Sequence, residues 1–130
     1  MPSLRDEIAA KKFEKPLSHA EARGSALSFI EFRPDAHTRT GFAASQLLHY
    51  TLEPNPAATE GDKDAPPDRL TFAFHTADVA VLGTRLARLV ELIGSHELAA
   101  VVAMDSRYAN AEATQPFVAE ILIRRLDKPD

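Results

Sequence analysis

Cysteine is absent from this chain of 130 residues, which excludes disulfides, thiolate metal sites and a cysteine nucleophile. The five glycines are scattered and form neither a G-x-G-x-x-G fingerprint nor a Walker loop. The G-x-S-x-G and H-E-x-x-H sequences of familiar serine and zinc hydrolases are missing as well. The longest apolar run, Leu98 to Met104, is too short to cross a bilayer. We therefore predict no cofactor and no membrane partner.

The composition is that of one ordinary globular domain. Hydrophobic residues make up 45% of the chain and charged residues 26%, which suits a core of normal size. The segment Met1 to Glu7 becomes acidic where a secretory signal would be apolar. Together with the missing cysteine, this favours the cytoplasm. Abundant alanine and a preference for arginine over lysine are typical of a GC-rich bacterial source.

The net charge of −4 is concentrated in one segment. Glu53 to Asp68 holds five acids against Lys63 alone, and the rest of the chain is neutral, with fourteen acids and fourteen bases. An evenly mixed surface lacks the basic stripe that binding to a phosphate backbone usually needs. Nucleic acid is therefore disfavoured as a partner, and the charge pattern says nothing of a small-molecule ligand.

Residues 1–24 are predicted to form an N-terminal helical arm. Pro2 and Ser3 suit the start of a helix. Ser18 to Glu21 has the spacing of a capping box, and Gly24 follows as a stop, which favours one more helical turn. Residues 25–126 are predicted to be a single α+β domain, and residues 127–130 an exposed tail.

Five segments have the composition of β-strands: Ala26 to Arg33, Gln46 to Leu52, Leu70 to His75, Leu98 to Met104 and Phe117 to Arg125. Alternation predicts that Leu70, Phe72 and Phe74 point inward, and that Leu48, Tyr50 and Leu52 share one face of their strand. The last strand is expected to place four residues on the core face: Phe117, Ala119, Ile121 and Ile123. A second sheet face would hold three apolar side chains: Leu47, Val118 and Leu122.

Glu53 to Asp68 is predicted to be a long, mobile acidic loop. It contains four prolines and a glycine, and it lacks apolar periodicity. Its acids do not have the spacing of an EF-hand. Polar residues make Asp105 to Gln115 a second predicted loop.

The segment from Thr76 to Gly94 has two possible interpretations. Apolar residues at three- and four-residue spacing would suit one long helix capped by Thr76. However, Gly83 would then lie in its interior at a cost of about 1 kcal/mol, and Val79 to Leu82 alternates with β-branched residues. We therefore favour a turn at Thr76 to Asp78, a strand over Val79 to Leu82, and a helix capped by Thr84 that ends at Gly94. The predicted fold is α+β: an antiparallel sheet of five to six strands packed against one main helix, residues 84–94.

Three segments carry a resemblance to a known group: Leu47 to Tyr50, Leu70 to Val79, and Val81 to Leu86. Over residues 26–102 the chain resembles small bacterial proteins of unknown function that have an F-(S/H)-T-x-x-V-x-(I/V)-x-G-x-x-L segment before a short helix. The resemblance implies a strand followed by a helix around Gly83 and implies no activity. The order of four strands and a helix is also similar to a single-stranded-DNA-binding transcriptional-regulator fold, which is an analogy of fold alone.

Few residues are candidates for chemistry. His49 and His75 fall on non-core faces of consecutive strands, about 7–8 Å apart if these pair as a hairpin, and Glu120 could complete a metal site. His75 with Asp78 could form an acid–base pair, although such residues beside a turn more often bind backbone N–H groups. Four arginines could contribute to an anion patch: Arg33, Arg39, Arg124 and Arg125. For all of these, the prediction is solvated or structural side chains, with no catalytic, cofactor or metal residue assigned.

Three classes of function remain as hypotheses. The first, which we favour, is a non-enzymatic binding or assembly module that forms homo-oligomers, because one helix leaves part of a sheet uncovered. The second is a nucleic-acid-binding regulator, which rests on the fold analogy. The third is a small enzyme or metal-binding domain that uses His49, His75 or Asp78, for which no motif exists.

Overall fold

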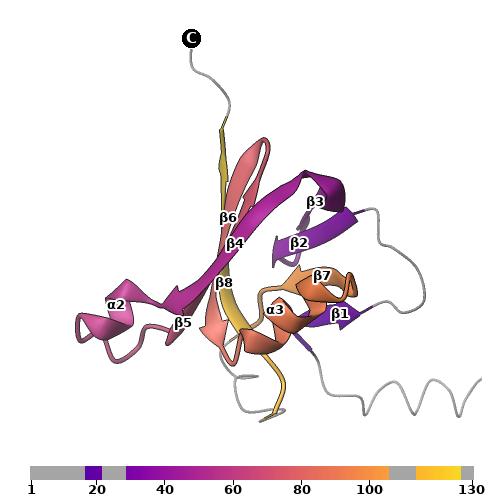
Figure 1. Cartoon of the computed structure of the whole chain (residues 1–130). Coiled ribbons are helices and arrows are strands. Elements are labelled where there is room, and N and C mark those ends of the chain that lie inside the picture. Colours follow the sequence, from indigo (N-terminus) through magenta and orange to yellow (C-terminus); the bar gives the residue numbers. More distant parts are fainter. Residues whose placement is uncertain (1–16, 22–28, 106–113, 127–130) are drawn as a thin grey trace, which may run out of the picture.

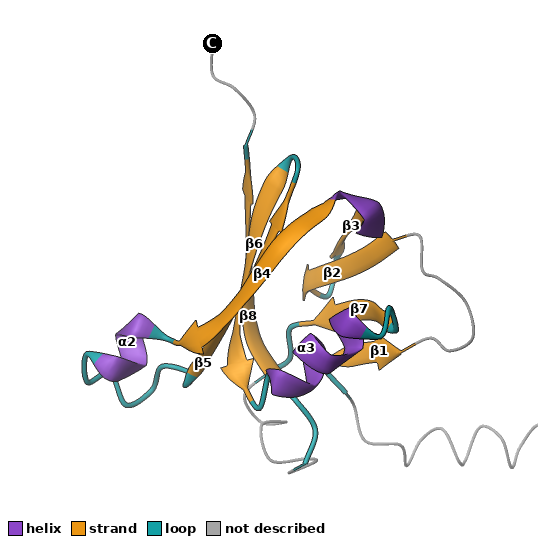
Figure 2. Ribbon diagram, in the orientation of Figure 1, coloured by secondary structure: helices purple, strands orange, loops and turns teal. Residues whose placement is uncertain are grey.

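The structure is a computed structural model, and it describes residues 17–21, 29–105 and 114–126. The described chain is α+β and consists mostly of strand, with two four-stranded sheets and two short α-helices (Figures 1 and 2). The first sheet has the order β1-β7-β2-β3: β1 (His19–Glu21), β7 (Leu98–Val102), β2 (Phe29–Asp35) and β3 (Thr38–Ala43). The second has the order β4-β5-β6-β8: β4 (Leu47–Pro54), β5 (Asp68–Phe74), β6 (Ala77–Thr84) and β8 (Phe117–Arg125). The predicted α+β class is confirmed, whereas the single sheet of five to six strands is wrong.

The inward faces of β5 and β6 confirm the predicted alternation. Leu70, Phe72 and Phe74 are buried, as are Val79 and Val81 on the neighbouring strand. The two strands pair as a tight antiparallel hairpin in which Phe72 lies opposite Val79. Paired residues of an antiparallel ladder share a face, so these side chains form one apolar surface. The interpretation of the segment around Gly83 as a hairpin followed by a helix is therefore confirmed, although the strand is longer than predicted, because Ala77 and Asp78 of the expected turn already belong to β6 (Ala77–Thr84).

The main helix is shorter than predicted. Thr84 does not cap it, because Thr84 is still part of β6 and pairs with Phe117. Arg85 then takes a positive φ of 58°, and α3 (Ala87–Gly94) follows, with Leu86 at the N-cap position. The carboxylate of Asp68 accepts a hydrogen bond from the Leu86 N–H at 3.3 Å, so a side chain from β5 holds the residue that precedes the helix. The end at Gly94 is as predicted.

The first sheet contains the largest departures from prediction. The capping-box segment is not a helical turn, because His19–Glu21 pairs antiparallel with β7 as β1. Ser18 contributes to this arrangement: its carbonyl accepts the Val102 N–H at 2.7 Å and its hydroxyl accepts the Val118 N–H at 2.9 Å. Strand β3 was not predicted at all, and β2 pairs with β7 in parallel. The sheet is therefore not wholly antiparallel.

Strand β8 has an irregularity that changes which side chains are buried. Leu82 pairs with Glu120 but Gly83 pairs with Val118, so one residue of β8 has no counterpart on β6. Such a bulge reverses the alternation beyond it. Val118 is consequently buried and Ala119 exposed, the opposite of the prediction for both. Ile121 is buried in the core as predicted. Phe117 is buried as well, but it pairs with Thr84 and lies on the opposite face of β8 from Val118, not on the predicted core face.

The acidic segment after β4 contains a helix that was not predicted. Asn55 is buried, and its side-chain amide donates to the Pro66 carbonyl at 2.8 Å while its oxygen accepts the Ala57 N–H at 3.4 Å. Asn55 is thus the N-cap of α2 (Pro56–Thr59), which has proline at its first position as such helices favour. In Figure 1, α2 lies at the far end of the β4–β5 hairpin.

The core lies between the two sheets. Leu86, which precedes α3, and Leu89 and Leu92 of α3 cover one side of it. Figure 1 shows the first sheet and α3 on the same side of the second sheet. Leu122, on the other side, is 51% exposed, and no described element covers that face. The predicted helix before residue 17, most of the polar loop 105–115 and the tail 127–130 lie outside the described residues. No helix within the described ranges is long and apolar enough to cross a membrane.

Candidate interaction surface

The three residues considered for a metal site are not brought together. His49 pairs with Ala73 in the β4–β5 ladder, but the ladder skips a residue at Leu48 and the His75 N–H bonds to Gln46, so the simple hairpin on which the diagonal arrangement depended is interrupted. Glu120 lies on β8, at the opposite edge of the same sheet from β4. Three strand spacings of about 4.8 Å separate β8 from β4 by roughly 14 Å, and Glu120 is in register with Glu53, not with His49, so the two side chains are too far apart for a shared ion. In the described part of the chain, no three His, Cys, Asp or Glu side chains are arranged to hold a metal.

Asp78 has a structural partner. Its carboxylate accepts a hydrogen bond from the Arg124 guanidinium at 2.7 Å, across the β6–β8 pair. The backbone N–H of His75 donates to the Gln46 carbonyl at 3.0 Å. The structure therefore joins Asp78 to Arg124 and His75 to Gln46, the residue before β4.

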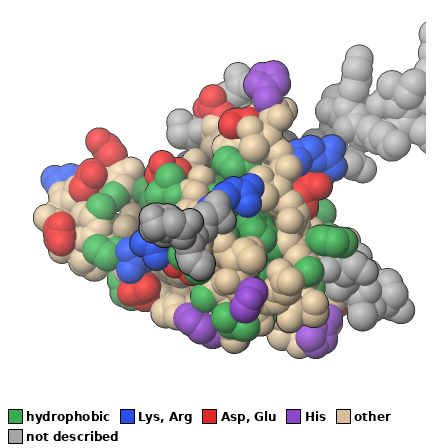
Figure 3. Space-filling model, turned by 90° about the horizontal axis from the view of Figure 1, so that it is seen from above, with side chains coloured by type: hydrophobic (Ala, Val, Ile, Leu, Met, Phe, Trp, Pro, Cys, Tyr) green, Lys and Arg blue, Asp and Glu red, His purple; other side chains and the backbone are tan. Residues whose placement is uncertain are grey.

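The arginines do not form the anion patch that the sequence allowed. Arg33 and Arg39 both donate through Nε to one carboxylate oxygen of Glu31, the second at 3.1 Å. Arg124 is paired with Asp78 on the other sheet. Figure 3 shows acidic and basic side chains interspersed over the visible face, with acidic ones gathered at the end of the molecule that carries α2.

The cluster of Glu31, Arg33 and Arg39 has a testable consequence for the ionisation of Glu31. Hydrogen bonds from Arg33 and then from Arg39 lower the pKa of Glu31 below its usual 4.5. A lowered pKa means that the carboxylate stabilises the fold above about pH 4.5 and that this contribution is lost as pH falls through the lowered value. We expect Arg33→Gln to raise the pKa of Glu31, and Arg39→Gln to raise it less, when followed by carboxyl-carbon NMR. Asp35 is the internal control. Its pKa is lowered first by the His37 N–H and then by Thr38, and it should not move; an unchanged Glu31 would contradict the assignment.

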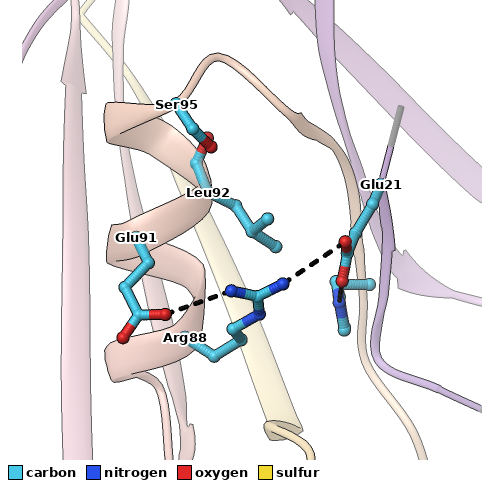
Figure 4. A network of polar contacts seen from close by, with 6 residues as sticks. Glu21, Arg88, Glu91, Leu92 and Ser95 are labelled. Atoms are coloured by element: carbon cyan, nitrogen blue, oxygen red, sulfur yellow. Dashed lines mark hydrogen bonds and ion pairs between the residues drawn. The ribbon is translucent and has the colours of Figure 1, made fainter. Parts of the chain in front are cut away.

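A second polar cluster joins β1 to α3 (Figure 4). Glu21 accepts from His19 Nε2 at 2.8 Å and from Arg88 Nη2 at 3.5 Å, and Arg88 also donates to Glu91 at 3.1 Å. His19 is buried, and its Nδ1 has no hydrogen-bond partner. A histidine held by a carboxylate is the geometry of a general base, but a base must reach its substrate, and the free nitrogen here is enclosed. The cluster therefore fastens β1 to the helix.

A small apolar pocket opens beside the start of β4. It has a volume of about 160 Å³. Its lining comes from β2, the 3-10 turn η1 (Ala44–Gln46), the start of β4, α3, the turn after α3, and β7: Ile30, Ala44, Leu47, Leu92, Ile93, His96 and Leu98. His96 is its single titratable side chain. A volume near 150 Å³ is enough for a benzene-sized group. One imidazole gives such a pocket little means of orienting a substrate, because specific sites use several convergent polar groups.

Strand β4 presents the most exposed apolar surface of any described strand. Leu48 is 65% exposed, Tyr50 41% and Leu52 38%. Tyr50 lies opposite Phe72, and Leu52 opposite Leu70, so both belong to the core-side face of the sheet but extend past the cover that the first sheet provides. Leu48 lies between Leu47 and His49, where the ladder skips a residue. Aromatic and large apolar side chains with so much exposure are typical of a contact surface.

The sequence placed Leu48, Tyr50 and Leu52 on one face of their strand, which holds for Tyr50 and Leu52, whereas Leu48 lies at the irregularity in the ladder. It did not show that the three side chains are exposed. Of the side chains predicted for a second face, Leu122 is indeed outside, whereas Leu47 packs against the core and Val118 is fully buried. A signal was nevertheless present, because β4 lacks the central valines and phenylalanines of β5 and β6. This difference is typical of an edge strand.

No protein-family model, curated protein or solved structure matches this chain. The resemblance to small bacterial proteins therefore stays a prediction.

Proposed function

We propose that this chain is a non-enzymatic assembly module that forms homo-oligomers in the cytoplasm. The observation that carries the proposal is β4, an eight-residue strand at the edge of its sheet that exposes Leu48, Tyr50 and Leu52. An edge strand offers unpaired backbone groups to another chain, and here it adds apolar side chains that contact would cover. The uncovered Leu122 face of the same sheet adds to the surface available for association.

The arrangement of the polar side chains supports an assembly role over catalysis, metal binding or nucleic-acid binding. His19 is buried, Asp78 is paired with Arg124, and His49 lies at the opposite edge of the sheet from Glu120. Arg33 and Arg39 share Glu31, which leaves little excess positive charge for a phosphate backbone. Salt-dependent binding of single-stranded oligonucleotides at low ionic strength would favour the regulator hypothesis instead.

The test is the mass of the protein in solution. We expect light scattering coupled to size exclusion to give about twice the chain mass of 14.2 kDa, or a higher multiple, at micromolar concentration. On dilution the mass should fall toward that of one chain, as mass action requires. If the mass stays that of one chain at every concentration up to about 100 μM, the free energy of association is weaker than roughly 5 kcal/mol. This result would contradict the proposal.

A further inference from the structure

The backbone of β4 shows which of its groups are available for pairing. The Asn55 N–H donates to the Pro67 carbonyl at 2.8 Å, which continues the β4–β5 ladder one step past Pro54. In an antiparallel ladder, hydrogen-bonded and non-hydrogen-bonded pairs alternate. Glu53, Thr51 and His49 therefore direct their backbone groups toward β5. Tyr50, Leu52 and Pro54 direct theirs to the open edge, where a proline without an N–H is tolerated.

The other three sheet edges are less suited to pairing. Strand β1 has three residues, and β3 contains Gly41 and carries Thr38 and Arg39 exposed at its start. Near its start, β8 already donates the Val118 N–H to the Ser18 hydroxyl and accepts the Met104 N–H at 2.9 Å. Natural edges are protected by charged side chains, proline and bulges. On β4 such features occur at the bulge around Leu48, at Glu53 and at Pro54, so the residues from His49 to Leu52 are unprotected.

A second copy of β4 fits this edge in one register. Two identical antiparallel strands related by a two-fold axis through the sheet must pair residues of the same face. With Thr51 on the axis, Tyr50 lies opposite Leu52 of the second copy, and His49 lies opposite Glu53. The hydrogen-bonded pair is then Tyr50 with Leu52, whose backbone groups are those directed outward. An axis at Tyr50 would place His49 opposite Thr51, and an axis at Leu52 would place Thr51 opposite Glu53.

We propose that β4 pairs antiparallel with β4 of a second copy, with Thr51 opposite Thr51. The β4-β5-β6-β8 sheets of the two copies would thereby join into one continuous sheet. This inference rests on the proposed assembly function and specifies its interface. Each class of side chain meets a suitable partner: Thr with Thr, Tyr50 with Leu52, and His49 with the Glu53 carboxylate. Such cross-strand pairs each contribute about 0.2–1 kcal/mol.

Complementary polar side chains line up across the proposed interface. Glu53 is already paired with Arg69 of β5 at 3.1 Å and is 39% exposed on its side chain. In the proposed register the order of side chains across the joined sheets is Arg69, Glu53 and then His49 of the second copy. The Glu53 carboxylate has two oxygens, and the structure uses Oε2 for Arg69, which leaves Oε1 for the imidazole.

The absence of cysteine makes a cross-linking test clean. Thr51→Cys should give a covalent dimer on mild oxidation, because facing residues in a non-hydrogen-bonded pair have Cα atoms about 4.5 Å apart, within the range of a disulfide. Tyr50→Cys should cross-link more slowly, since its two copies would be diagonal at about 7–8 Å. Thr38→Cys, exposed at the start of edge strand β3, controls for random collision. The measurement is the rate of dimer formation on non-reducing gels.

The outcomes separate this inference from the proposed function. An oligomeric wild type in which Thr51→Cys cross-links no faster than Thr38→Cys would overturn the β4 interface while assembly stands. Faster cross-linking of Tyr50→Cys than Thr51→Cys would overturn the register. A monomeric wild type would remove both proposals. As a second measurement, Thr51→Arg should raise the dissociation constant of the dimer about tenfold or more, because like charges would face each other across the axis. Thr38→Arg should leave it unchanged.

Discussion

Replacing Gly83 with alanine should lower the free energy of unfolding by about 3 kcal/mol or more. A Cβ at this position would lie 2.1 Å from the Phe117 carbonyl oxygen and 3.0 Å from the Val118 Cα. Both obstacles are backbone atoms of β8, so no change of rotamer relieves the clash, and the β6–β8 ladder would have to separate. The clash falls at the β8 bulge, where Gly83 pairs with Val118. The measurement is urea or guanidinium unfolding at fixed protein concentration, since association would shift the midpoint.

Gly94→Ala is the matched control for this change. A Cβ at Gly94 meets nothing within 4 Å, and the residue ends α3. Because alanine is the better helix former by about 1 kcal/mol, we expect stability equal to the wild type or slightly higher. If Gly83→Ala unfolded at the same denaturant concentration as Gly94→Ala, the close approach of β8 to β6 would be wrong.

The part of the fold predicted from the sequence is the part that local pattern determines. Leu70, Phe72 and Phe74 alternate strictly, and Gly83 separates a strand pattern from a helix pattern, so β5, β6 and α3 were all expected. The structural role of Gly83 differs from the argument by which Gly83 was used to predict a strand. Its cost in a helix favoured a strand, whereas the structure shows that it admits the backbone of β8.

The elements that were missed depend on partners far away in the chain. Strand β1 is held by β7 and by a hydrogen bond from Val118, one hundred residues beyond Ser18. Its three residues carry no strand pattern of their own, whereas Ser18 to Glu21 matches a local capping rule that tertiary contacts override. The buried Val118 and exposed Ala119 follow from a bulge, which no periodicity within β8 reveals.

The candidate surface was predictable in its residues but not in its exposure. Alternation placed Leu48, Tyr50 and Leu52 together, yet the sequence does not contain the order of strands in a sheet. Only the order β4-β5-β6-β8 shows that β4 has one neighbour among the described strands, and that His49 and Glu120 lie on opposite edges. The same strand order argues against a metal site, because His49 and Glu120 of one copy cannot meet. It favours an interface instead, because His49 of one copy can meet Glu53 of a second copy at the β4 edge.

Phe32→Ala should be the most damaging core truncation, with a loss of about 3–5 kcal/mol. Phe32 is fully buried on β2 and makes edge-to-face contacts with three other rings, at centroid distances of 5.1 Å to Phe72, 6.0 Å to Phe74 and 6.1 Å to Phe42. Two of these rings belong to β5, so Phe32 connects the two sheets. Its removal leaves a cavity between layers that the hydrogen-bonded strands cannot close, and this loss is a large fraction of the 5–15 kcal/mol that stabilises a typical domain.

Phe29→Ala is the matched control, since it removes the same side chain from the same strand. Phe29 is 60% exposed and points to the opposite side of β2, beside Gly41. We expect its loss to cost less than about 1 kcal/mol, because a surface ring gives up little buried area. Thermal or denaturant unfolding of the two variants therefore compares one ring between the sheets with one ring outside them. Equal destabilisation would mean that the two sheets do not pack through Phe32.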